Sequence, residues 1–226
     1  SADPALEIDA DLRPEGRQGP LVRSLDSYRA YYERWSSPWE AQALLRARAV
    51  AGDPDLGASF EALVDSLRWP EEGLSAESLR EMRRLKARME AERLPRGADP
   101  TLHTKQGRGG LADVEWVVQM LQMQNAAQIP ALRTTSTLDA LNSEVELGLL
   151  DVADGTILRE AWLLATRVRN FHVLATGRAS DAVPSQGPEL TAVAFLGHYD
   201  PPAELLEDYR RTTRRARTVV ERLFYG

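Results

Sequence analysis

Three short segments of the sequence carry polar side chains whose spacing could support chemistry. In the first, residues 5–13, apolar and polar residues alternate from Leu6 onwards, and Glu7, Asp9 and Asp11 occupy every second position. If this segment is a strand, its carboxylates form a row spaced about 6–7 Å apart on one face. Such a row needs a compensating cation where it is partly buried, and Mg²⁺ held by carboxylates serves phosphoryl transfer in this way. Spacing alone favours a solvated strand face.

The second segment, residues 37–51, is a strong helix candidate with two arginines. Ser37 is an N-cap residue and Glu40 completes a capping box with it. Arg48 falls on the apolar face of this helix, whereas Arg46 lies to one side of that face. A guanidinium group keeps its charge and therefore seeks a carboxylate or a phosphate. A structural ion pair, for example with Glu40, is the alternative explanation.

The third segment, residues 103–116, places glycines directly before a predicted helix. Backbone amides at such a position could bind a phosphate or a carboxylate, although the pattern matches neither the P-loop nor the dinucleotide-binding motif. Asp113 and Glu115 lie in the first turn of the helix, where acidic residues also favour the helix dipole. Lys105 could pair with Asp113 or reach an anion.

Other charged groups give weaker signals. The three histidines are widely separated and form no helical metal-ligand pair, which argues against a zinc site. The arginine-rich run at 210–217 could bind phosphate, but the solvated face of a final helix is the simpler interpretation.

Composition excludes several classes of protein. The 226 residues are 43% hydrophobic and 27% charged, which is ordinary for a folded protein. A net charge of -6 argues against a nucleic-acid partner, and no apolar run is long enough to cross a membrane. Cysteine is absent, so we expect a cytoplasmic protein. The sequence starts at Ser1 rather than Met, which suggests a piece of a longer polypeptide.

The elements that position these segments are mainly helical. Residues 5–13 and 21–23 are expected to form a short strand or hairpin, separated by a turn rich in proline and glycine. Periodicity and capping residues predict a first helix that starts at Ser24 or Ser27 and runs to Trp35. They predict further helices at 37–51, 53–69, 76–93, 111–127, 136–147, 153–176, 189–197 and 202–224. We therefore expect a mainly α protein, a helical bundle preceded by a short β-strand remnant.

Taken in order, the three segments resemble the C-terminal part of bacterial glutamine synthetase adenylyltransferases, most closely the actinobacterial ones. The stretches that carry the resemblance are 8–16, 38–53 and 105–119. The resemblance implies that residues 1–23 end a polymerase-β-type nucleotidyltransferase domain and that residues 24–226 form a C-terminal helical bundle domain. It also implies transfer of AMP from ATP to a tyrosine of glutamine synthetase, with Mg²⁺ as cofactor. Elsewhere in such a protein a second unit removes AMP by phosphorolysis, and a PII-type signal protein regulates both.

The resemblance also assigns roles to residues. Asp9 matches the third aspartate of the family's metal site, which implies that it binds Mg²⁺ and helps to activate the tyrosine hydroxyl. Asp11 departs from the family pattern, so its metal role stays open. Arg13 would support the phosphates or the strand turn. The other two aspartates and the triphosphate-gripping loop do not occur in this sequence, so we expect the chain alone to be inactive.

Two interpretations of the helical part remain. As part of an enzyme, it would close over the nucleotide with Arg46, Arg48 and Lys105. As a binding module, it would dock glutamine synthetase or the PII-type regulator through exposed helix faces.

Overall fold

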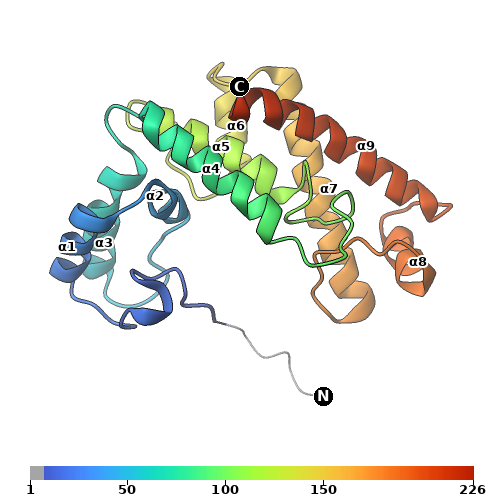
Figure 1. Cartoon of the computed structure of the whole chain (residues 1–226), viewed down its shortest axis with the longest axis horizontal. Coiled ribbons are helices and arrows are strands. Elements are labelled where there is room, and N and C mark those ends of the chain that lie inside the picture. Colours follow the sequence, from blue (N-terminus) through green and yellow to red (C-terminus); the bar gives the residue numbers. More distant parts are fainter. Residues whose placement is uncertain (1–7) are drawn as a thin grey trace. The chain divides into compact units, whose positions relative to one another are not determined.

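The computed structural model describes residues 8–226, which form two compact units that divide between Arg68 and Trp69 (Figure 1). Within these described residues there are nine α-helices, of which α1–α3 belong to the first unit and α4–α9 to the second. The prediction of a mainly helical bundle is confirmed. The domain boundary expected after Arg23 lies inside the first unit and stays a prediction. None of the helices in 8–226 is both long and apolar enough to cross a membrane.

The first unit contains α1 (Leu25–Trp35), α2 (Pro38–Leu44) and α3 (Pro54–Arg68). Polar side chains fix where these helices start. Ser24 Oγ accepts a hydrogen bond from a first-turn amide of α1 at 3.2 Å. The Glu40 carboxylate accepts one from the Ser37 amide at 3.1 Å, and Asp53 accepts one from the Leu56 amide at 2.9 Å. These bonds satisfy backbone donors that have no partner inside a helix.

Helix α2 ends at Leu44 and is therefore shorter than the sequence predicts. The Arg68 guanidinium donates to the carbonyl oxygens of Leu44 and Ala47 at 3.3 and 2.8 Å. This side chain thereby supplies hydrogen-bond donors to carbonyl groups at the helix end, which have no donor within the helix. Arg46 therefore lies in a turn and Arg48 in the loop that follows, both exposed. The prediction that Arg48 shares the apolar face of the helix is wrong.

The second unit is built around α5, a helix buried on nearly every side. Ten of its fifteen side chains are buried, as expected for a helix with apolar residues all round. It packs against α6, α7 and α9, and α7 packs in turn against α8 and α9 (Figure 1). The helices are α4 (Ala76–Glu92), α5 (Leu111–Asn125), α6 (Thr137–Glu146), α7 (Val152–Thr176), α8 (Gly187–Leu196) and α9 (Ala203–Val220), and a π-helical turn (Glu221–Tyr225) follows.

The loop that precedes α5 is held to this unit by hydrophobic packing and by backbone hydrogen bonds. Leu102 is buried in a hydrophobic cluster with Val183 and with Tyr209 of α9. The backbone also forms a short bridge, in which the Thr104 amide donates to Asp181 O and the Val183 amide donates to Leu102 O, both at 2.7 Å. The loop is therefore held in place although it contains no helix or strand.

No strand forms in the described part of the N-terminal segment, residues 8–23. Residues 5–7 of the predicted strand lie outside the described residues. Arg13 instead closes a compact loop, donating to the carbonyl oxygens of Ala10, Arg17 and Gly19. The alternating pattern specifies a strand only where a neighbouring strand supplies hydrogen bonds, and a two-stranded hairpin is marginal in water. The strand prediction is therefore wrong for residues 8–23.

Glu144 of α6 is a buried carboxyl group without a stabilising partner. Its side chain is fully buried, and neither carboxylate oxygen forms a hydrogen bond with the residues described. Burial raises the pKa of Glu144 from 4.5 to about 9. The group is therefore neutral at pH 7 in the folded protein but ionised in the unfolded chain, and this difference opposes folding.

We expect Glu144→Gln to stabilise the second unit by an amount that grows with pH. Because the folded pKa is raised, the wild type loses stability as pH rises from 4.5 towards 9. The variant lacks this loss and should gain on the order of 3 kcal/mol at pH 7. Urea unfolding at a series of pH values measures the difference. Glu146→Gln on the exposed side of the same helix is the control, and parallel pH profiles for wild type and Glu144→Gln would contradict the assignment.

Candidate functional site

The carboxylates predicted to act in catalysis lie in the N-terminal loop of the first unit. Asp9 and Asp11 are both exposed, and Asp9 Oδ1 accepts a hydrogen bond from the Asp11 amide at 2.8 Å. Asp11 Oδ2 pairs with Arg17 Nε at 2.8 Å. The three hydrogen bonds that Arg13 donates all go to the backbone of the same loop. Asp11 is thus paired with a cation and Arg13 with the loop backbone, whereas within residues 8–226 the Asp9 carboxylate has only the Asp11 amide as a hydrogen-bond partner.

The described residues do not compose a magnesium site by themselves. Nowhere in residues 8–226 do three or more histidine, aspartate or glutamate side chains gather as metal ligands. Mg²⁺ requires nearly octahedral oxygen coordination. Asp9 could contribute one such oxygen, and Asp11 is already neutralised by Arg17. The predicted role of Asp9 in metal binding stays a prediction.

The structure brings the first two sequence motifs to one cavity of about 250 Å³ in the first unit. Leu12 from the N-terminal loop and Trp39 and Arg46 from the second motif all line it. Arg48 is not among the lining residues. Arg46 is therefore the arginine of the second motif that stands beside the loop containing Asp9.

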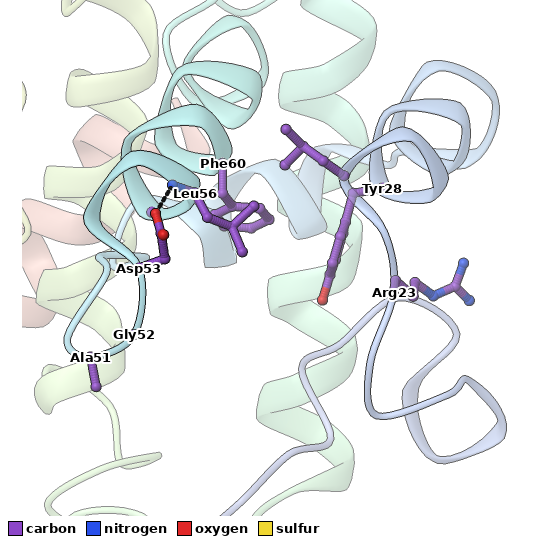
Figure 2. A pocket seen from close by; sticks show the side chains of 9 residues that line it. Arg23, Tyr28, Ala51, Gly52, Asp53, Leu56 and Phe60 are labelled. Atoms are coloured by element: carbon purple, nitrogen blue, oxygen red, sulfur yellow. Dashed lines mark hydrogen bonds between the residues drawn. The ribbon is translucent and has the colours of Figure 1, made fainter.

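A second cavity in the first unit, of about 280 Å³, is walled mainly by apolar side chains (Figure 2). Tyr28 and Phe60 face each other across it, with ring centroids 5.2 Å apart in an edge-on arrangement. Asp53 is used in capping α3, and the Arg23 guanidinium points away from Phe60. Because no polar groups converge on this cavity, it does not fit an active site.

In the second unit, the glycine-rich loop uses its amides internally. The Gly109 amide donates to Asp113 Oδ2 at 2.7 Å, and the Gly110 amide donates to Gly107 O at 2.9 Å. The first amides of α5 bond to the loop as well, because Ala112 N donates to Lys105 O at 3.0 Å. An anion would have to break these bonds. The prediction that these amides could bind a phosphate or a carboxylate is therefore confirmed for a carboxylate, that of Asp113, and the amides engaged in this way are not open to a phosphate.

Asp113 lies at the centre of a buried ion-pair cluster. Its carboxylate pairs with Lys86 of α4 and, at 3.0 Å, with Arg217 of α9. Glu90 accepts from Lys86 at 2.8 Å, from Arg217 at 2.9 Å and from the Tyr225 hydroxyl at 3.0 Å. These five side chains connect α4, α5, α9 and the π-helical turn.

For Glu90 and Arg217 of this cluster, the contacts with opposite charges together outweigh the effect of burial on the pKa. Burial acts to raise the pKa of Glu90, but hydrogen bonds from Arg217 and Lys86 outweigh it and lower the pKa to about 2. The pKa of Arg217 is raised, because its bonds to carboxylates outweigh the effect of burial. Since the folded pKa of Glu90 is depressed, its stabilising contribution is present above pH 4.5 and disappears as pH falls towards 2.

The remaining predicted residues of the third motif take different places. Lys105 is exposed and is not the partner of Asp113, because Lys86 and Arg217 occupy both carboxylate oxygens. Glu115 is partly buried on α5. Local spacing did not reveal Lys86, Glu90 or Arg217. The one sequence signal was the four-residue spacing between Lys86 and Glu90, which places both on the same helix face.

Comparison with known proteins confirms the expected resemblance. Residues 1–63 match the family described as glutamate-ammonia ligase adenylyltransferase, and residues 79–225 match the family described as GlnD PII-uridylyltransferase. Each match falls within one compact unit.

The chain is also similar to curated enzymes named bifunctional glutamine synthetase adenylyltransferase/adenylyl-removing enzyme. It is 62% identical to that of Streptomyces avermitilis over 100% of this chain, and 58% identical to that of Mycobacterium tuberculosis strain H37Rv over 99% of it. In both cases the chain spans 23% of the relative's length.

We expect Asp113→Ala to destabilise the second unit by about 3–5 kcal/mol, since it leaves the buried Lys86 with Glu90 as its one carboxylate partner among the described residues and removes a partner from Arg217. Urea unfolding at pH 7 measures the loss. The control is Glu160→Ala, which removes a half-exposed partner 3.4 Å from Arg215. That pair should contribute less than about 1 kcal/mol. Equal effects of the two substitutions would show that the cluster is not a stabilising centre.

Proposed function

We propose that this chain, which belongs to the GlnD PII-uridylyltransferase family, is part of an enzyme that transfers AMP from ATP to a tyrosine of glutamine synthetase. The observation that carries the proposal is the 62% identity that extends over the whole chain to a bifunctional glutamine synthetase adenylyltransferase/adenylyl-removing enzyme. Because the chain spans 23% of that relative, the proposal concerns the enzyme of which it would form a part.

In the proposed reaction, the tyrosine oxygen attacks the α-phosphorus of ATP. A new oxygen–phosphorus bond forms, the bond to the β-phosphate breaks, and pyrophosphate leaves. The proton of the tyrosine hydroxyl must pass to a base, and an exposed carboxylate within reach can accept it. We assign this role to Asp9, which lies on the surface and has one carboxylate oxygen not bonded to Asp11. Mg²⁺ is proposed as a cofactor of the complete enzyme, because Mg²⁺ held by carboxylates serves phosphoryl transfer and Asp9 could supply one such oxygen.

The first unit supports this placement of Asp9. Arg13 holds the loop by three hydrogen bonds to carbonyl oxygens, so the backbone beside Asp9 is ordered by the loop's own residues. Leu12 and Arg46 line a common cavity next to this loop. A guanidinium group there is suited to an anionic substrate. We propose that Arg46, rather than Arg48, assists nucleotide binding.

The partners follow from the same assignment. Glutamine synthetase is the proposed protein substrate, because it stands in the name of the relatives. A PII-type signal protein is a proposed regulator, supported by the description of the family that residues 79–225 match. The proposed location is the cytoplasm, where glutamine synthetase would be accessible.

Asp9→Asn in the full-length enzyme is expected to reduce the rate of AMP transfer to glutamine synthetase by about 10²–10⁴-fold, because the amide cannot accept the proton. Incorporation of labelled AMP from ATP is the measurement. The matched control is Asp26→Asn, an exposed carboxylate in the first turn of α1, which should leave the rate unchanged. A rate within a factor of a few of wild type for Asp9→Asn would rule out the assignment.

Residues 1–226 alone should show no AMP transfer from ATP to glutamine synthetase when Mg²⁺ is supplied. The reason is that the described residues lack a cluster of carboxylates able to hold the metal. The same labelled-ATP assay tests this, with the full-length enzyme as the positive control. Transfer by this chain above background would show that its site is complete and would overturn the division of roles.

A further inference from the structure

A cavity of about 280 Å³ lies between the loop before α5 and helix α9, and its lining is strongly basic. The charged residues that line it are four arginines and one glutamate, and three threonines complete the lining. The arginines are Arg108, Arg210, Arg214 and Arg217. This local excess of positive charge stands out in a chain whose net charge is -6.

The fold holds these arginines in place. Arg210, Arg214 and Arg217 follow the spacing of one face of α9. Arg108 comes from the loop, where a Cβ on the neighbouring Gly109 would lie 1.9 Å from Thr213 O of α9. The backbone of Gly109 has a φ of +72°, which glycine adopts readily. The loop therefore lies directly against α9, and Arg108 emerges beside the arginines of the helix.

Two of the four guanidinium groups are already committed to protein carboxylates. Arg217 belongs to the buried cluster, and Arg210 lies 3.5 Å from Asp99. Arg108 and Arg214 are exposed, and their side chains form no ion pair or hydrogen bond with the residues described in 8–226. Two guanidinium groups beside the cavity are therefore free to bind a ligand.

The other arginines of α9 show that this lack of partners is confined to the cavity. Arg211 pairs with Asp208, and Arg215 pairs with Glu160. Neither Arg211 nor Arg215 lines the cavity. The arginines that face away from the cavity have acidic partners, whereas Arg214, between them in the sequence, has none among the residues that the structure describes.

We infer that this cavity binds a phosphate-class anion, either free phosphate or pyrophosphate or the polyphosphate end of a nucleotide. Guanidinium groups bind phosphoryl oxygens through paired, charge-assisted hydrogen bonds. The threonine hydroxyls donate to protein acceptors, for example Thr213 to Tyr209 O at 2.8 Å, so recognition rests on the arginines. The volume is below the usual range of about 300–1,000 Å³ for pockets that enclose a whole small-molecule ligand. It therefore suits phosphate groups rather than an enclosed nucleotide.

The site does not depend on the proposed transferase activity, since it rests on residues 101–221 of the second unit alone. Asp9 and the cavity beside Arg46 belong to the first unit. A loss of anion binding and a loss of AMP transfer would therefore be separate results.

Isothermal titration of the 226-residue chain with pyrophosphate, phosphate and ATP, each at matched ionic strength, tests the inference. We expect saturable binding of at least one probe with a stoichiometry of one. Arg108→Gln and Arg214→Gln should each weaken it about tenfold or more, because each removes a charged donor. If the nucleotide is the source of the anion, ATP binds most tightly and pyrophosphate displaces it. If free anions are the source, pyrophosphate or phosphate binds at least as tightly as ATP.

The matched control is Arg215→Gln, which removes the same charge from the next position of α9 but not from the cavity. It should keep wild-type affinity. Both sites are exposed, and unchanged thermal unfolding of each variant verifies the fold. The inference is overturned if none of the three probes binds saturably. It is also overturned if Arg214→Gln and Arg215→Gln weaken binding equally, since general charge attraction would then explain the result.

Discussion

The second unit depends on one buried carboxylate, that of Asp113. It pairs with Lys86 of α4 and Arg217 of α9 and accepts the amide hydrogen of Gly109. A carboxylate removed from water stays ionised only where such partners replace its hydration. Helix α4, helix α9 and the loop before α5 must therefore all contact this carboxylate for the buried charges to be compensated. The loop before α5 and the basic side of α9 take their positions from this meeting point.

Much of the helical fold could be predicted because the signals that start helices are local. Ser24 and Ser75, for example, cap α1 and α4 from within a few residues. The end of α2 could not be predicted in this way, because Arg68 reaches the Leu44 carbonyl from 24 positions away. The prediction of an N-terminal strand was wrong for a related reason. Alternation describes which side of a strand is apolar, but hydrogen bonds from a neighbouring strand are needed to form it.

The candidate site shows the same division between local and distant information. Sequence pattern identified Asp113 but left open whether the nearby Lys105 is its partner, whereas the actual partners lie 27 and 104 residues away. The family resemblance singled out Asp9, which no local spacing distinguished from Asp11. In the structure, Asp11 is paired with Arg17. That difference between two similar carboxylates depends on how the loop folds back, which the alternating pattern does not contain.

The contact between Gly109 and α9 restricts which residue can stand at position 109 but not which residue can stand at the adjacent position 108. At position 109 any side chain would collide with the Thr213 backbone, so that residue is fixed by shape. At position 108 the side chain is exposed and lines the cavity beside α9. The loop thus combines a residue fixed by its backbone contact with a neighbouring residue whose side chain does not determine the position of the loop. Selection or design could alter the charge presented to α9 at position 108 while the scaffold beneath it stays the same.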